Sequence, residues 1–124
     1  MKRILVVLAA ALLLAGCSAP KNADPAIREY MTDHLSNPDT YTVGETVVIE
    51  EGTIDRSKTV NWENLPEGDR IPVSVVRHSF TYVDRTETLT NADFIFYMNP
   101  DLDVIYYVHR DLGAGPMFSL EKAK

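Results

Sequence analysis

The sequence has a single cysteine, Cys17, so no disulfide can form within the chain. It also has few basic residues, with 12 lysines and arginines against 18 acidic residues and a formal net charge of −6. An acidic chain is a poor partner for nucleic acid or for a bare anionic membrane surface. The longest apolar run, residues 4–14, has 11 residues, whereas a membrane-spanning helix needs about 17 to 25. These shortages exclude a disulfide-stapled fold and disfavour a nucleic-acid-binding protein and a membrane-spanning helix.

The rest of the composition is that of an ordinary globular domain. The chain has 124 residues, of which 45% are hydrophobic and 24% charged. This length and balance allow one domain with a modest core. No repeat, coiled-coil pattern or second domain is visible.

The N-terminal segment has the features of an export signal. Lys2 and Arg3 precede the apolar run, and small residues with a cysteine close it. The sequence Leu14-Ala15-Gly16-Cys17 resembles the lipobox of bacterial lipoproteins. This resemblance implies that residues 1–16 are a cleaved signal peptide. It also implies that Cys17 carries fatty acyl chains such as palmitate, which anchor the protein to a membrane of the cell envelope.

The same resemblance bears on the protein's location. In similar lipoproteins an Asp after the cysteine favours retention in the inner membrane, and this chain has Ser18 there. The outer membrane is therefore favoured if the host has two membranes. Residues 17–23 would form a lipidated tether, and the six that follow Cys17 reach at most roughly 20 Å. Loss of Lys2 and Arg3 with the signal would leave a net charge of −8 on the mature chain.

A helix is predicted at the start of the remaining domain, residues 24–124. Asp24 is suited to cap it and Pro25 to occupy its first turn. Asn37-Pro38 should end it, because the residue before a proline avoids helical geometry. The positions expected on its buried face are Ile27, Tyr30, Met31, His34 and Leu35.

Four later segments alternate apolar and polar residues and predict strands: residues 41–50, 71–83, 94–98 and 104–109. Gly44 suggests a bulge in the first, and a change of apolar parity suggests a bulge or twist in the second. Turn-forming residues at 84–86 and 99–103 predict hairpins. The fold class is therefore α+β, with one N-terminal helix packed on an antiparallel sheet of about four strands. The helix-then-sheet order resembles cystatin-like folds.

Two segments show neither the apolar spacing of a helix nor the alternation of a strand. Residues 52–70 predict a long loop, in which Trp62 and Leu65 are expected to cover the sheet rather than form an exposed aromatic platform. Near the end of the chain, Gly113 to Pro116 should break the last strand, and Met117, Phe118 and Leu120 are expected to pack back onto the domain.

No pattern of catalytic or metal-binding residues emerges. His34, His78 and His109 have no metal-ligand spacing, and Ser79 should point away from His78 because neighbours in a strand face opposite sides. We therefore assign no catalytic residue, metal or cofactor, and expect a protein that is not an enzyme. The candidates for binding contacts are Trp62, Tyr106 and His109.

Three functional hypotheses follow. The first is a non-catalytic binding or accessory module of the envelope, with an unidentified protein partner. The second is a periplasmic inhibitor or immunity protein that neutralises a cationic enzyme. The third is a small-ligand carrier or hydrolase with an aromatic-lined pocket between helix and sheet.

Overall fold

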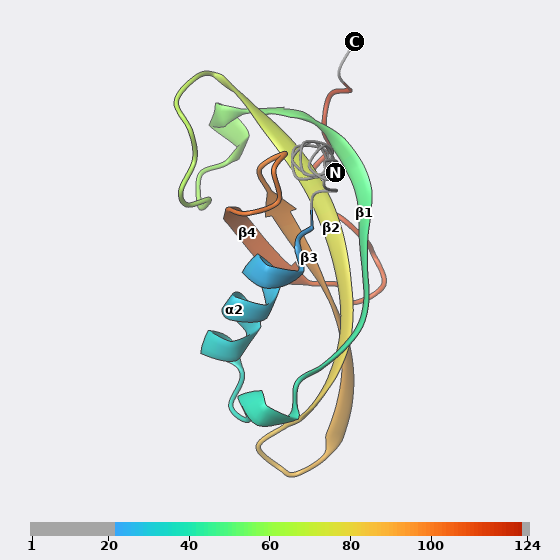
Figure 1. The fold of residues 1–124 in the computed structure, drawn as a ribbon. Helices are drawn as coiled ribbons and strands as arrows, with labels where there is room; N and C mark the ends of the chain where they lie inside the picture. The colour runs from blue at the N-terminus through green and yellow to red at the C-terminus, as the bar shows by residue number, and fades with distance from the viewer. Residues whose placement is uncertain (1–21, 123–124) are drawn as a thin grey trace, which may run out of the picture.

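The computed structural model describes residues 22–122, so the predicted signal peptide and Cys17 lie outside the described residues. Its elements, in chain order, are α2 (Asp24–His34), η1 (Pro38–Thr40), β1 (Thr42–Asp55), η2 (Arg56–Lys58), β2 (Arg70–Val83), β3 (Leu89–Met98) and β4 (Ile105–Arg110). The strands pair antiparallel in the order β1-β2-β3-β4. Helix α2 packs on this sheet (Figure 1), which confirms the predicted α+β class with one helix and four strands.

Each face of the sheet carries its own hydrophobic cluster. The helix-side cluster joins Ile27 and Met31 of α2 to strand residues that include Val76 and Phe96. The loop-side cluster lies on the other face, around Trp62. Its other buried members are Ile54, Ile71, Val73, Val75, Ile95, Tyr97 and Tyr106. Strands β2 and β3 contribute to both clusters, which explains why apolar residues occur at both parities along them.

Of the bulge or twist predicted in β2, the bulge is absent. Residues 74–83 pair one for one with β3, without any shift of register. The apolar parity changes because Ile71, Val73 and Val75 face the loop-side cluster, whereas Val76 and Phe80 face the helix-side cluster. The change of apolar parity along β2 therefore reflects which face of the strand is covered.

The bulges lie on β1 instead. Its register with β2 shifts between Val43 and Glu45 and again between Val48 and Glu50. The bulge predicted at Gly44 is therefore confirmed. A Cβ atom at this glycine would lie 2.9 Å from the carbonyl oxygen of Ser79, so a larger residue would push the two strands apart.

Strand β1 is longer than predicted, because Gly52 to Asp55 continue it instead of starting the loop. The chain's C-terminal segment pairs with this part of β1. Thr53 and Glu121 exchange two backbone hydrogen bonds of 2.8 Å, and the Glu121 carboxylate forms an ion pair with Arg70. The loop thus shrinks to residues 56–69, with η2 as its first turn.

Trp62 packs over the sheet as predicted. Only 7% of it is exposed, and its ring lies 5.1 Å from those of Tyr97 and Phe118. Leu120 also packs against the loop-side cluster. Met117 was expected to do the same but is 61% exposed, because the chain bends there so that its neighbour Phe118 faces the cluster.

The helix differs from the prediction at both ends. Ala23, not Asp24, caps α2, and Asp24 is the first helical residue, with its backbone N–H donating to Oδ1 of Asn22 at 2.9 Å. At the other end, His34 is exposed instead of buried. The helix stops there, and the His34 ring stacks on Tyr30 at 3.9 Å instead of entering the core.

Both predicted hairpin turns are present and are held by a side chain. In the turn after β3, Oδ1 of Asn99 accepts the backbone N–H groups of Asp103 and Val104 at 3.0 and 2.9 Å. In the turn after β2, the Asp84 carboxylate accepts hydrogen bonds from Thr86, Thr88 and Thr90. These bonds favour the ionised form and lower the pKa of Asp84 to about 2.

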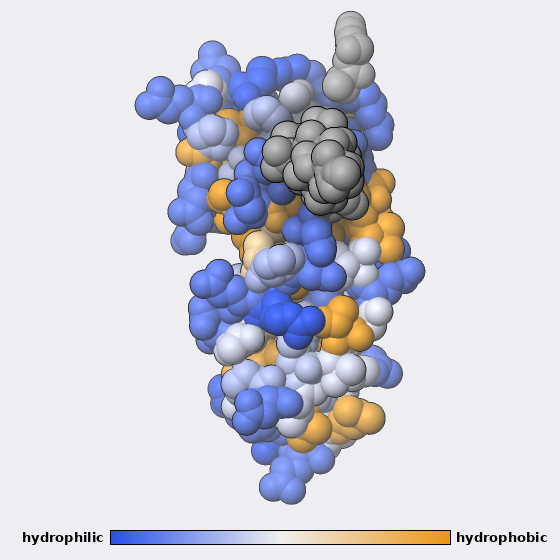
Figure 2. Space-filling view, viewed as in Figure 1, coloured by the Kyte–Doolittle hydropathy of each residue, from blue (hydrophilic) through white to orange (hydrophobic). Residues whose placement is uncertain are grey.

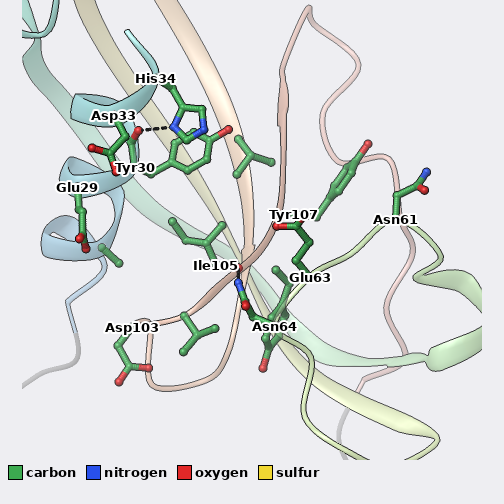
Figure 3. A pocket seen from close by; sticks show the side chains of 14 residues that line it. Glu29, Tyr30, Asp33, His34, Asn61, Glu63, Asn64, Asp103, Ile105 and Tyr107 are labelled. Carbon is green, nitrogen blue, oxygen red and sulfur yellow. Dashed lines mark hydrogen bonds between the residues drawn. The ribbon is translucent and has the colours of Figure 1, made fainter.

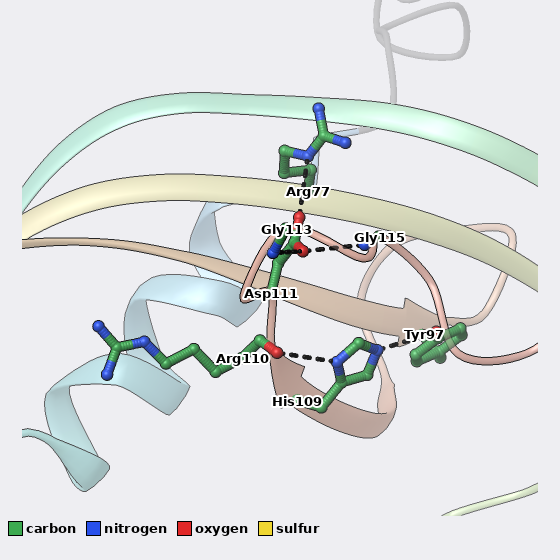
Figure 4. Close-up of polar contacts among 7 residues, drawn as sticks. All are labelled: Arg77, Tyr97, His109, Arg110, Asp111, Gly113 and Gly115. Atoms are coloured by element: carbon green, nitrogen blue, oxygen red, sulfur yellow. Dashed lines mark hydrogen bonds and ion pairs between the residues drawn. The ribbon is translucent and has the colours of Figure 1, made fainter.

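The chain after β4 is tied to the sheet by two polar groups (Figure 4). Oδ1 of Asp111 accepts the N–H groups of Gly113 and Gly115, both at 2.9 Å. Oη of the buried Tyr97 accepts the N–H of Met117 at 2.8 Å and lies 3.0 Å from Nε2 of His109. The segment that delivers Phe118 to the loop-side cluster is thus fixed on β3.

The face shown in Figure 2 is mostly hydrophilic, and its apolar side chains lie in small separate patches. Within residues 22–122, no helix combines the length and the hydropathy needed to cross a bilayer.

Candidate functional site

A groove of about 600 Å³ runs beside β4, the last strand of the sheet. We call it the β4 groove. Helix α2 forms one wall, residues 61–64 form the other, and residues 103–108 form the floor (Figure 3). Its lining residues are Ala26, Glu29, Tyr30, Asp33, His34, Asn61, Glu63, Asn64, Asp103, Val104, Ile105, Tyr106, Tyr107 and Val108.

The groove exists because its two walls belong to opposite faces of the sheet. Helix α2 packs on the helix-side face. Burial of Trp62 in the loop-side cluster holds residues 61–64 against the opposite face. The backbone N–H of Glu63 then donates to the carbonyl of Tyr106 at 2.9 Å, which fixes this wall against β4. The edge of β4 is left between the two walls.

A bulge in β4 shapes the floor. Tyr107 pairs with Tyr97 but Ile105 pairs with Met98, so Tyr106 is an extra residue. The strict alternation predicted for residues 104–109 is therefore wrong at this point. Both tyrosine rings consequently approach Trp62, at 6.2 Å for Tyr106 and 6.0 Å for Tyr107.

The groove is acidic. Glu29, Asp33, Glu63 and Asp103 line it with exposed side chains, and its lining contains no lysine or arginine. Their field is felt by the tyrosines of the groove. The pKa of Tyr30 is raised by burial first and by the charge of Glu63 second. Burial and then the charge of Asp103 raise the pKa of Tyr106 in the same way.

The aromatic part of the groove is rigid. Tyr30 is stacked on His34 and meets Phe96 edge to face at 5.5 Å. Nδ1 of His34 lies 2.7 Å from the carbonyl oxygen of Tyr30, one turn earlier in α2. Figure 3 shows Tyr30 and His34 pointing from the helix towards β4, with Tyr107 across from them. The groove therefore combines packed aromatic rings with exposed acidic side chains.

The three candidate binding residues gather on the loop-side face, but they do not form one exposed site. Trp62 is buried and lies outside the groove lining, so it supports the wall instead of touching a ligand. Tyr106 is 5% exposed and lines the floor. His109 lies farther along β4, bonded to Tyr97.

The four carboxylates of the groove were not anticipated from the sequence. They come from three segments far apart in the chain, and Glu29 and Asp33 occupy positions typical of the solvent-facing side of a helix. Only their spacing of four residues, which places both on one side of α2, hinted at a shared surface.

The buried histidine has a structural setting. His78 is 1% exposed, and its Nε2 and Nδ1 lie 2.5 Å from Oη of Tyr41 and 2.8 Å from Oγ1 of Thr46. The pKa of His78 is lowered, chiefly by burial. The charge of Asp24 raises this pKa and that of Arg28 lowers it, both to a smaller extent. Ser79 does not bond to it. Among residues 22–122, no three His, Cys, Asp or Glu side chains come together in a way that could hold a metal ion.

Comparison with known proteins identifies the N-terminal segment. Residues 1–18 match the family described as the prokaryotic membrane lipoprotein lipid attachment site. This match contains Cys17 and the small residues before it. No curated protein and no solved structure matches the chain.

Proposed function

We propose that this chain, a bacterial lipoprotein anchored to a membrane of the cell envelope, is a non-catalytic binding module that holds a cationic group of an envelope partner in the β4 groove. One observation carries the proposal: four carboxylates and no lysine or arginine line a groove with fixed tyrosine rings. The acyl chains on Cys17 would supply the anchor and the groove the recognition.

The chemistry of the groove suits a lysine or arginine side chain. Opposite charges raise the rate of encounter and fix the orientation of a partner. A cation over the face of a tyrosine gains about 0.5 to 1 kcal/mol at an exposed site. Tyr107 lies beside Glu63, and Tyr30, which has one face stacked on His34, lies beside Asp33 (Figure 3). An anionic ligand would be repelled by the four carboxylates.

The tether limits where the partner can be. Residues 18–23 span at most roughly 20 Å, so the domain stays near the bilayer surface. By the lipoprotein resemblance, Ser18 favours the outer membrane in a host with two membranes. Binding would therefore take place close to the bilayer surface.

The absence of catalysis is part of the proposal. His78 is buried and engaged by Tyr41 and Thr46, and His109 is engaged by Tyr97. Tyr97 of the loop-side cluster lies 5.1 Å from Trp62 and 5.3 Å from Phe118, so its ring packs in the core instead of lining a ligand pocket. A cystatin-like relationship stays a prediction.

The acidic groove also favours one alternative, an inhibitor or immunity protein directed against a cationic enzyme. The two functions differ in what binding does to the partner. Under the alternative, the purified partner would be an enzyme, and the lipoprotein would abolish its activity at a stoichiometric ratio.

The proposal is tested by affinity capture from envelopes solubilised in mild detergent. The bait is the mature lipoprotein, compared with an Asp33→Asn/Glu63→Gln variant that removes two charges from the groove. A Glu67→Gln/Asp69→Asn variant is the matched control, because both residues are exposed and lie outside the groove lining.

We expect the wild type and the control to retain the same specific protein, and the groove variant to lose it. Retention should also weaken as salt rises. The proposal is wrong if the groove variant captures that protein as well as the control does, or if no specific protein is recovered with any bait.

A further inference from the structure

The two edge strands of the sheet are protected very differently. Along β1, bulges at Gly44 and Ile49 interrupt the outer edge, and the bridge from Thr53 to Glu121 closes its far end. Bulges and added cover are the usual means by which proteins keep an edge from pairing with another chain. Along β4 the structure shows such cover at residues 105 and 106, where Nδ2 of Asn64 donates to the carbonyl of Ile105 at 3.4 Å and the N–H of Glu63 donates to the carbonyl of Tyr106.

The hydrogen bonds show which groups of β4 are directed outward. The backbone N–H of Asp111 donates to the carbonyl of Asp93 on β3, so the backbone groups of Asp111 are directed towards β3. Alternate residues of an antiparallel strand face opposite ways, which turns the backbone groups of Arg110 and Val108 away from β3. Nδ1 of His109 lies 3.2 Å from the carbonyl oxygen of Arg110. The N–H and C=O of Val108 are the pair left facing the groove.

We infer that the β4 groove accepts an extended, lysine- or arginine-containing peptide segment of the partner as a fifth strand, paired with Val108. This inference rests on the proposed function and specifies the form of its ligand. A residue placed opposite Val108 can exchange two backbone hydrogen bonds with it, which is how extended peptides add to a sheet edge. The Glu63 contact at Tyr106 limits the pairing to a short stretch.

The walls determine which side chains the segment carries. Successive residues of a strand point to opposite faces. Val108 packs with the helix-side cluster, so the residue opposite it faces α2, where Glu29 and Asp33 lie. Its two neighbours face the other wall, where Glu63 and Tyr107 lie. Basic side chains are therefore favoured on both faces of the segment.

Charge also decides between a partner and a second copy of this chain. Two copies joined through β4 would bring two sets of four groove carboxylates together, which repel at short range. Like charges placed face to face in an interface oppose its formation. A basic segment from another protein meets no such obstacle.

The test uses the full mature lipoprotein in neutral detergent and three synthetic probes. The first is a ten-residue peptide that alternates lysine with threonine and valine. The second has the same sequence with N-methyl groups on alternate central amides, which block strand pairing but keep the charge. The third is spermine, a cation with no peptide backbone. Affinity is measured by calorimetry and the exchange of the Val108 amide proton by NMR.

We expect the unmodified peptide to bind at least about tenfold more tightly than the N-methylated one, because pairing hydrogen bonds are lost. We also expect it to slow exchange of the Val108 amide at least tenfold. Asp33→Asn/Glu63→Gln should weaken all three probes, while Glu67→Gln/Asp69→Asn should leave them unchanged.

Other results would overturn the inference, and they separate it from the proposed function. If all three probes bind equally and only the groove variant weakens them, the groove binds cations but does not pair with a strand. If no probe binds, or if both double variants weaken binding alike, the proposed function fails as well. A salt-resistant dimer that protects Val108 without any probe would show that a second copy occupies the edge.

Discussion

Gly52→Ala should detach the chain's C-terminal segment from β1. An added Cβ atom would lie 2.3 Å from the carbonyl oxygen of Glu121 and 3.1 Å from Cβ of Leu120. The first distance is far inside van der Waals contact, and its partner is backbone, which cannot rotate away as a side chain can. Either the strand or the segment must move, and the segment is held by fewer interactions.

The cost can be estimated from what the segment loses. Its two backbone hydrogen bonds with Thr53 are worth about 1 kcal/mol each, and the exposed ion pair between Arg70 and Glu121 adds about 0.5 kcal/mol. Loss of packing by the half-buried Leu120 adds about 1 kcal/mol. Alanine recovers about 0.5 kcal/mol by restricting the unfolded chain. We therefore expect the free energy of unfolding to fall by about 3 kcal/mol.

Trp62 is the chain's only tryptophan and lies in the cluster that Leu120 joins, so its fluorescence during urea unfolding reports the change. The control is the same substitution in a chain that ends at Ser119, where the atoms nearest to the new Cβ are gone. There Gly52→Ala should be neutral or slightly stabilising. An equal loss in both backgrounds would refute the argument, because the obstacle could not then be the C-terminal segment.

Three further outcomes are expected. Intact-mass analysis should find wild-type protein beginning at an acylated Cys17, and Cys17→Ala protein unmodified with residues 1–16 retained; an unmodified wild type would contradict the anchor. Because burial holds the pKa of His78 below its ordinary 6.5, the unfolded chain takes up more protons there, and stability should fall as pH drops below about 6.5, by at most about 1.4 kcal/mol per pH unit. This slope should be smaller in a His78→Gln variant, and an equal slope would exclude His78 as its source. Carbon NMR should show Asp84 titrating at about 2, so its contribution to stability is present above the ordinary value of 3.8 and is lost as pH falls through about 2; Thr86→Ala should raise this pKa, and a titration near 3.8 in the wild type would show that the turn's hydrogen bonds are absent.

Local chemistry made much of the fold predictable. The turns at Asp84 and Asn99 follow from side chains that accept backbone N–H groups nearby, and Gly44 marks a bulge because a side chain would meet the neighbouring strand. The strands followed from alternation, which holds wherever one face alone is covered. These features depend on neighbours in sequence or on a single partner strand.

The β4 groove could not be predicted in this way. Its walls meet only after Trp62 is buried on one face and α2 on the other, and no local pattern specifies that pairing. The bulge at Tyr106 likewise depends on the register of β4 with β3. Met117 and Phe118 illustrate the same limit, since two adjacent apolar residues have opposite fates once the chain bends between them.

The position of the groove in the chain has a consequence for biogenesis. Its walls and floor come from residues 26–34, 61–64 and 103–108, so the last part to be synthesised is the floor. Cys17, which lies in the matched attachment site, precedes every part of the groove. The groove is therefore complete only when almost all of the chain's length has been made.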